Sequence, residues 1–216
     1  MKRIKVRVTD LDSVAYYKQS DLTLEDLLRR LRREEEPSDQ LLSGRAFHSV
    51  LEHASVGDEL GVVEQDGWTI DFRLLESSIA LPPIREQSLS RTFVVDGVEV
   101  ELRGKVDGFD GVTVIDYKGA SRFQPTVYID NYQWKAYLLM TGASRFTHYV
   151  FVRKIDGRTV VMRELHRLTN YAYNGMEEAV IGSIRDYLAI AREHLPEQFV
   201  ETEEPQHEPY PMESES

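Results

Sequence analysis

The stretch that most restricts what this chain can fold into is GKVDGFDGVTVIDYK, at residues 104–118. Its alternating apolar residues predict two strands, and the Asp-Gly pair at 110–111 suits a tight type I′ hairpin turn. With that pair as the loop, Asp107 lies opposite Val114. Side chains alternate along a strand, so Asp107 and Asp116 would share one face as diagonal neighbours. Their backbones would then lie about 7–8 Å apart, within reach of one shared ion.

The second strand of this hairpin ends in an unusual pair of charges. Residues 112–115 are apolar on both faces, as in a strand that is covered on both sides, yet Asp116 and Lys118 follow at once. Buried charge is costly, so the pair needs a reason. One interpretation is a structural ion pair at a strand end. The other is a hard-cation site, in which Asp107 and Asp116 bind the metal and Lys118 lies beside a water or a phosphate.

Composition excludes several other kinds of site. The 216 residues include no Cys, which rules out disulfides, thiolate zinc sites, iron–sulfur clusters and a Cys nucleophile. No apolar run is long enough to span a bilayer, and the N-terminus lacks a signal-peptide core. We therefore expect a cytoplasmic protein without a membrane partner.

The net charge of −11 argues against a generic nucleic-acid coat, but its distribution weakens that argument. Residues 196–216 carry seven acids and no Lys or Arg, so residues 1–195 carry only −4. We expect residues 1–195 to form one domain and residues 196–216 to be an acidic disordered tail. Plain solubilising disorder is the simpler interpretation of the tail, and a DNA mimic or a partner-binding segment is the alternative.

The hydrophobic periodicity predicts a mixed α/β (α+β) fold with helices flanking a central sheet. The chain should contain strands, helices and hairpins in this order: a strand at 2–8, a turn at 10–17, helices at 22–33 and 44–55, a hairpin at 59–72, strands at 88–95, 98–107 and 112–118, a helix at 127–140, strands at 146–153 and 158–165, and a helix from 169 or 170 to 195. Ser43 should cap the second of these helices. The helix at 127–140 should return the strand at 146–153 to the same sheet, in parallel.

Two further groups of side chains have a structural and a functional interpretation. His48 and Glu52 are one helical turn apart beside an apolar face, where a histidine is more often a core residue than a metal ligand. Arg29, Arg30, Arg32 and Arg33 end a predicted helix, where cations suit the helix dipole. A solvated helix end explains these arginines more simply than a DNA contact does.

Four elements together resemble a known family. Asp107 followed by Asp116-Tyr117-Lys118 is similar to the D…(D/E)-x-K signature of the PD-(D/E)XK nuclease superfamily. The order helix, three strands, helix, strand resembles the restriction-endonuclease-like core of that superfamily. Gly44 to His48 resembles the G…H element of its RecB-like branch, and Gln133 to Tyr137 resembles the Q-x-x-x-Y element of the same branch.

The resemblance implies a role for each matching residue. Asp107, Asp116 and Lys118 would be catalytic. The ion, Mg²⁺ or Mn²⁺, would be held by the side chains of three residues and one backbone carbonyl: His48, Asp107, Asp116 and the carbonyl of Tyr117. Gln133 and Tyr137 would bind the substrate, and Glu52 could lie in the surroundings of the ion or stay a helix-surface acid.

The implied activity is metal-dependent hydrolysis of DNA to 5′-phosphate and 3′-hydroxyl products, as an exonuclease in recombination, repair or the processing of mobile-element or viral DNA. Because the chain has neither cysteines nor a G-x-x-x-x-G-K-[ST] motif, it resembles a stand-alone RecB-like nuclease without an iron–sulfur cluster or its own ATPase. DNA would be the partner, with a helicase, recombinase or single-strand-binding protein beside it. These motifs do not decide between exonuclease and endonuclease action. The competing hypothesis is a catalytically silent nuclease-fold module for nucleic-acid binding or assembly.

Overall fold

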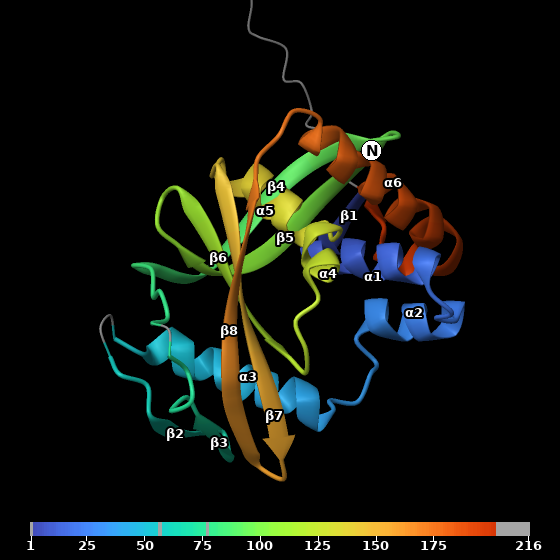
Figure 1. Ribbon diagram of the computed structural model, residues 1–216. Coiled ribbons are helices and arrows are strands. Elements are labelled where there is room, and N and C mark those ends of the chain that lie inside the picture. The colour runs from blue at the N-terminus through green and yellow to red at the C-terminus, as the bar shows by residue number, and fades with distance from the viewer. Residues whose placement is uncertain (1, 56–57, 77, 202–216) are drawn as a thin grey trace, which may run out of the picture.

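A mixed β-sheet with helices on both faces forms the body of the protein, as expected (Figure 1). The computed structural model describes residues 2–55, 58–76 and 78–201. Within them, nine strands form one sheet in the order β2-β3-β8-β7-β6-β5-β1-β9, and β4 pairs with β5. The strands are β1 (Lys2–Arg7), β2 (Val62–Gln65), β3 (Trp68–Asp71), β4 (Ile84–Val95), β5 (Val98–Phe109), β6 (Thr113–Ala120), β7 (Arg145–Asp156), β8 (Thr159–Tyr171) and β9 (Val200–Glu201). The helices are α1 (Val8–Gln19), α2 (Leu24–Arg32), α3 (Asp39–His53), α4 (Pro125–Ile129), α5 (Gln133–Thr141), α6 (Met176–His194) and the 3₁₀ turn η1 (Pro196–Gln198).

The alternation of side chains along β6 divides the apolar residues into two cores. Val114 packs in a cluster with residues of α1, α5 and α6, whereas Ile115 and Tyr117 pack in a second cluster with residues of α3. Each fully buried side chain of this size stabilises the fold by about 1.5–3 kcal/mol. Since Asp116 and Lys118 follow Val114 at intervals of two, they project towards the face that α5 covers.

The crossover between β6 and β7 brings distant residues side by side. The two strands pair in parallel, as predicted, with Asp116 opposite His148. The expected single helix at 127–140 is wrong, because residues 130–132 separate α4 from α5. Asp12 on α1 accepts a hydrogen bond from the Tyr132 backbone amide at 2.5 Å, which fixes where α5 begins.

Three other helix boundaries also differ from the sequence prediction. Residues 10–17 are helical rather than turn-like, since Val8, Leu11 and Val14 of α1 are all buried. Helix α3 begins at Asp39 with Ser38 as its cap, and Ser43 lies inside the helix. The last helix begins at Met176 because residues 169–170 still belong to β8.

The hairpin between β5 and β6 has a longer loop than predicted. Phe109 pairs with Val114, and residues 110–112 form the loop between β5 and β6. The Asp110 carboxylate accepts the backbone amides of Val112 and Thr113, at 2.9 and 2.7 Å, and thereby closes the turn. Asp107 therefore lies opposite Asp116 in the register, instead of opposite Val114. The difference is two residues, so Asp107 and Asp116 remain on the same side of the hairpin.

The end of the described chain contradicts the predicted start of the tail at residue 196. Residues 196–201 form η1 and β9, and Val200 pairs with Arg3 of β1. Tyr187 on α6 donates a hydrogen bond to the Gln198 side chain at 2.7 Å. The predicted disordered tail otherwise falls on residues 202–216, which lie outside the described residues. None of the helices in the described part of the chain has the length and apolarity that crossing a bilayer requires.

Candidate active site

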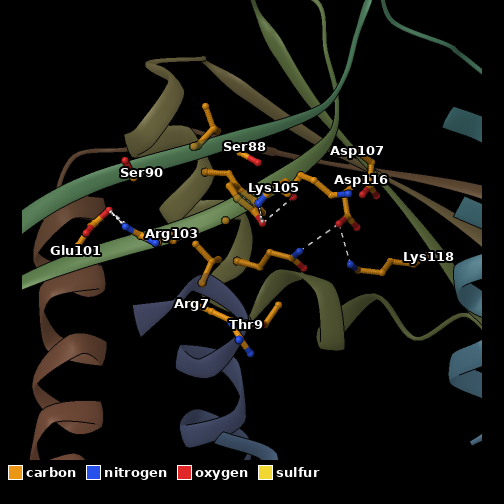
Figure 2. Close-up of a pocket in the computed structure, with 15 residues that line it drawn as sticks. Arg7, Thr9, Ser88, Ser90, Glu101, Arg103, Lys105, Asp107, Asp116 and Lys118 are labelled. Atoms are coloured by element: carbon orange, nitrogen blue, oxygen red, sulfur yellow. Dashed lines mark hydrogen bonds and ion pairs between the residues drawn. The ribbon is translucent and has the colours of Figure 1, made fainter. Parts of the chain in front are cut away.

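One cavity of about 640 Å³ gathers most of the residues that the sequence singled out (Figure 2). Asp107 of β5, Asp116 and Lys118 of β6, and Gln133 and Tyr137 of α5 all line it. Figure 2 shows Asp107, Asp116 and Lys118 at one end of the cavity, with Arg103 towards the other end. The predicted catalytic and substrate-binding side chains therefore meet in one place.

His48 lies beside this group, on α3. Its Nδ1 is 3.5 Å from Oδ1 of Asp107. Burial alone would lower the pKa of His48, but the neighbouring Asp107 carboxylate outweighs burial and raises it. His48 is thus a partner of Asp107 and not a core histidine.

Glu86 of β4 completes a cluster of three metal-ligand types that the sequence did not reveal. One donor atom each from His48, Glu86 and Asp107 lie within 4.8 Å of one another. Arg85 pairs with Gly108 and Gln87 with Val106, so Glu86 stands opposite Asp107. Its backbone is left-handed, with φ of 53°, which is strained for a residue with a side chain. No sequence pattern marks such a residue, because neither the register nor the φ angle is visible before the strands pair.

Asp116 contacts three side-chain donors and is not one of the three clustered ligand types. Its Oδ1 accepts hydrogen bonds from Lys118 Nζ at 2.7 Å and from Gln133 Nε2 at 3.2 Å. Its Oδ2 lies 3.1 Å from Nδ1 of His148, a buried residue that the sequence analysis did not select. Burial opposes ionisation of Asp116, but the Lys118 ammonium and the His148 contact outweigh it and lower the pKa of this carboxyl.

Lys118 is charged in this arrangement. Burial acts against the ammonium, yet the Asp116 and Asp107 carboxylates raise the pKa of Lys118 above its ordinary value. The ammonium is held at the cavity wall by Asp116, 2.7 Å away. The predicted pairing of Asp116 and Lys118 is present, inside a cavity and not on an open surface.

Tyr137 and Gln133 reach the cavity from one face of α5. The Tyr137 hydroxyl donates to the Lys105 carbonyl at 2.9 Å and accepts from the Lys105 amide at 3.1 Å. Burial raises the pKa of Tyr137 to about 12, so this hydroxyl stays neutral. A Cβ on Gly104 would lie only 2.5 Å from the Tyr137 ring, and the glycine therefore lets α5 approach β5.

Two predicted residues contribute in other ways. The Tyr117 backbone amide donates to Oδ2 of Asp107 at 2.7 Å, which links the two strands and orients that carboxylate. The ligand role of the Tyr117 carbonyl stays a prediction. Glu52 is exposed on α3, and its charge is among those that raise the pKa of Lys105, after the larger effect of the Glu86 side chain.

Most of the rest of the cavity is a basic, hydroxyl-rich arm that sequence patterns did not predict, although Glu101 also lines it and forms an ion pair with Arg103. Alternation along β5 places Arg103, Lys105 and Asp107 on the same side of the strand. The arm, as we call it below, is formed by six side chains of β1, α1, β4 and β5: Arg7, Thr9, Ser88, Ser90, Arg103 and Lys105. Figure 2 shows these residues on both walls of the cavity. Cations and hydroxyls of this kind match the oxygens of a phosphodiester backbone.

The donor set fits a hard divalent cation. Two carboxylates and one imidazole converge at His48, Glu86 and Asp107. Mg²⁺ and Mn²⁺ accept such oxygen-rich sites and need only a few protein ligands, because they keep bound waters. No protein thiolate is available as a ligand, since the sequence has no Cys.

Sequence comparison identifies no relative, whereas structure comparison identifies the fold. No protein-family model and no curated protein matches the chain. The solved structure of SSO0001 superposes with a TM-score of 0.52 at 16% identity, covering 88% of this chain and 76% of that one. At this identity the likeness shows the fold alone. An alkaline exonuclease from Laribacter hongkongensis, LHK-Exo, covers 89% of each chain at 12% identity, but its TM-score of 0.40 is too low to establish a common fold.

Proposed function

We propose that the chain is a divalent-metal-dependent deoxyribonuclease of the RecB-like branch of the PD-(D/E)XK superfamily. The observation that carries the proposal is the convergence of His48, Glu86 and Asp107 at the end of a cavity that also holds Asp116 and Lys118. These residues come from α3 and three strands. All of them except Glu86 belong to motifs that the sequence alone suggested. A structural ion pair would explain Asp116 and Lys118 but not the neighbouring cluster of ligand types.

The residues of the chain divide the work of phosphodiester hydrolysis. His48, Glu86 and Asp107 would hold Mg²⁺ or Mn²⁺, with the Asp116 carboxylate and the Tyr117 carbonyl as further ligands. When bound, the ion supplies a nucleophilic water at neutral pH and charge relief at the phosphate. Lys118 donates to the scissile phosphate or to the attacking water. Gln133 and Tyr137 keep Asp116 and the β5 backbone in place, through the hydrogen bonds described above.

The arm supplies a path for one DNA strand away from the cut. Arg7, Arg103 and Lys105 offset the negative charge of the phosphates, while Thr9, Ser88 and Ser90 donate hydrogen bonds. The overall charge of −11 would repel DNA from most of the surface, so the arm favours binding in one place. Water attack with loss of the 3′ oxygen would leave 5′-phosphate and 3′-hydroxyl products.

We further propose that the enzyme starts at DNA ends, as an exonuclease in recombination, repair or mobile-element DNA processing. The test compares a linear duplex and a single strand, each labelled at one end, with a covalently closed circle of the same sequence. We expect Mg²⁺- or Mn²⁺-dependent loss of the linear substrates and persistence of the circle. Rapid cutting of the circle would replace the exonuclease proposal with an endonuclease.

Two variants separate the proposed site from a contaminating nuclease. Lys118→Ala and Asp116→Asn should lower the rate at least a hundredfold, because removing one preorganised group that stabilises a transition state typically costs about 10²–10³ in kcat. Arg73→Ala, an exposed arginine paired with Asp71 away from the cavity, should leave the rate unchanged. A wild-type protein that binds DNA but shows no metal-dependent cleavage would favour the alternative of a silent binding module.

A further inference from the structure

His148 is a buried histidine that the proposed mechanism does not yet use. It lies on β7, directly opposite Asp116 in the parallel β6–β7 pair, and its side chain has no exposed surface. Its Nδ1 lies 3.1 Å from Oδ2 of Asp116. Its Nε2 is also buried and has no hydrogen-bond partner among the described residues.

The surroundings of the ring make this arrangement costly for the fold. The imidazole packs between the rings of Tyr128 and Phe146, at centroid distances of 5.2 and 4.7 Å. An apolar residue would fill this space without leaving a polar nitrogen unsatisfied. Because Nε2 lacks a partner, the tautomer that the network favours is Nδ1–H, which donates to Asp116. Within the described part of the chain, the Asp116 carboxylate is therefore the one polar group that gains from His148.

The two oxygens of Asp116 have separate partners. Oδ2 faces buried His148, while Oδ1 faces Lys118 and Gln133 at the cavity. The second torsion of an aspartate side chain is broad, so the carboxylate turns easily unless one oxygen is fixed. A donor at Oδ2 fixes the carboxylate from the side away from the cavity and leaves Oδ1 directed at the cavity.

We propose that His148 is a positioning residue for the proposed nuclease reaction: its Nδ1–H holds the Asp116 carboxylate so that Oδ1 points at Lys118 and the metal-binding end of the cavity. The effect of His148 on catalysis rests on the proposed function. Its effect on the orientation of the Asp116 carboxylate rests on the geometry alone. Outer partners of this kind orient the groups that bind metals, and their loss commonly lowers metal affinity 10–100-fold.

Three variants test the proposal. His148→Leu removes the donor and fills the space, and His148→Phe does so with a ring. His148→Asn keeps an N–H at the position of Nδ1, because the Asn amide nitrogen is as many bonds from Cα as Nδ1 is. The matched control is Thr147→Val, which breaks the 3.0 Å hydrogen bond between the Thr147 and Thr169 hydroxyls on the adjacent position of β7 and does not touch Asp116.

The first readout is a crystal structure of each variant without DNA, which does not depend on activity. We expect the Asp116 carboxylate to turn in His148→Leu or His148→Phe and to keep its orientation in His148→Asn and Thr147→Val. An unchanged carboxylate in the apolar variants would overturn the proposal, even if the wild-type protein proved to be no nuclease.

The second readout is Mn²⁺ affinity by calorimetry, together with steady-state cleavage. His148→Leu or His148→Phe should weaken Mn²⁺ binding about tenfold or more and lower kcat with little change in KM, while His148→Asn recovers most of both. In an Asp116→Asn background, His148→Leu should have no further effect on Mn²⁺ affinity, because it acts through that carboxylate. An equal loss in His148→Asn and the apolar variants, or an undiminished loss in the Asp116→Asn background, would contradict a positioning role. A wild-type protein that binds Mn²⁺ but cleaves no DNA would refute the proposed function and leave the comparison of affinities decisive.

Discussion

Glu86 and Asp107 face each other across β4 and β5, and the strand pairing is interrupted at this position because Glu86 adopts a left-handed backbone. The strained residue thus lies at the point where donor atoms of β4, β5 and α3 converge. Strain of this kind persists only where the surroundings impose it, and it concentrates at functional sites. The relationship leads to the first prediction.

Glu86→Gly should lower the affinity for the metal while changing the stability of the fold little. The substitution relieves a left-handed backbone, and the relief offsets the lost side-chain contacts and the extra freedom of the unfolded chain. We expect a change in the free energy of unfolding of no more than about 1 kcal/mol in urea titrations. Mn²⁺ affinity, measured by calorimetry, should fall at least tenfold, and equally in Glu86→Gln. The exposed acid variant Glu164→Gln should bind Mn²⁺ as the wild type does. Wild-type Mn²⁺ affinity in both Glu86 variants would show that Glu86 is not a metal ligand.

Gly104→Ala should destabilise the protein through Tyr137. The added Cβ would lie 2.5 Å from a ring that two hydrogen bonds hold against Lys105. We expect a loss of about 1–3 kcal/mol in the free energy of unfolding. Gly61→Ala is the matched control, since a Cβ there meets nothing within 4 Å. In a Tyr137→Leu background the cost of Gly104→Ala should shrink, and additive costs would show that the ring is not the obstacle.

Stability should depend on pH through Asp12. Burial raises the pKa of Asp12 to about 6, against the hydrogen bond from the Tyr132 amide, whereas the ordinary value is 3.8. The folded state therefore holds this proton more tightly than the unfolded chain does. The stabilising contribution is fully present below pH 4 and is lost as the pH rises through about 6, by at most about 3 kcal/mol.

The measurement is urea unfolding of the wild type and of Asp12→Asn from pH 4 to pH 7. The asparagine oxygen still accepts from Tyr132, but it does not titrate. The wild type should lose stability relative to this variant as the pH rises, whereas the exposed variant Asp21→Asn should follow the wild type. A constant difference between wild type and Asp12→Asn across this range would refute the prediction.

Arg7 and Arg103 should contribute to DNA affinity through phosphates. Binding of a labelled oligonucleotide, measured in EDTA to prevent cleavage, should weaken in Arg7→Ala and Arg103→Ala for every sequence tested. The slope of log K against log salt should become shallower by about 0.7–0.9 for each phosphate contact removed. Arg73→Ala is again the control. An unchanged slope in both arm variants would mean that DNA follows another path.

The sequence predicted the chemical centre of the site better than its surroundings. Asp107, Asp116 and Lys118 lie on strongly patterned strands, and a two-residue error in the pairing register left them on one face because side chains alternate with a period of two. Gln133 and Tyr137 were selected through the resemblance to a Q-x-x-x-Y element, and their spacing of one helical turn correctly placed them on one face of α5. Glu86, His148 and the arm were missed because each depends on strand neighbours that are distant in sequence.

Helix boundaries failed where a tertiary contact overrode local pattern. The break between α4 and α5 depends on Asp12, which lies 120 residues away from the amide that it accepts. Residues 10–17 contain Asp and Ser and look turn-like, yet burial of Val8, Leu11 and Val14 makes them helical. Pattern alone could not weigh these contacts, because they form only when α1 packs against the sheet.

The donors that surround Asp116 come from β6, α5 and β7, and the last of them is encoded thirty-two residues after the carboxylate itself. A ribosome that has released the chain only as far as α5 has already delivered both aspartates and the lysine, but not the imidazole that aims one of them. On the proposed function, hydrolytic competence would thus be acquired late in synthesis, when β7 docks beside β6. An incomplete chain would then be poorly able to cleave the DNA of the cell that is making it.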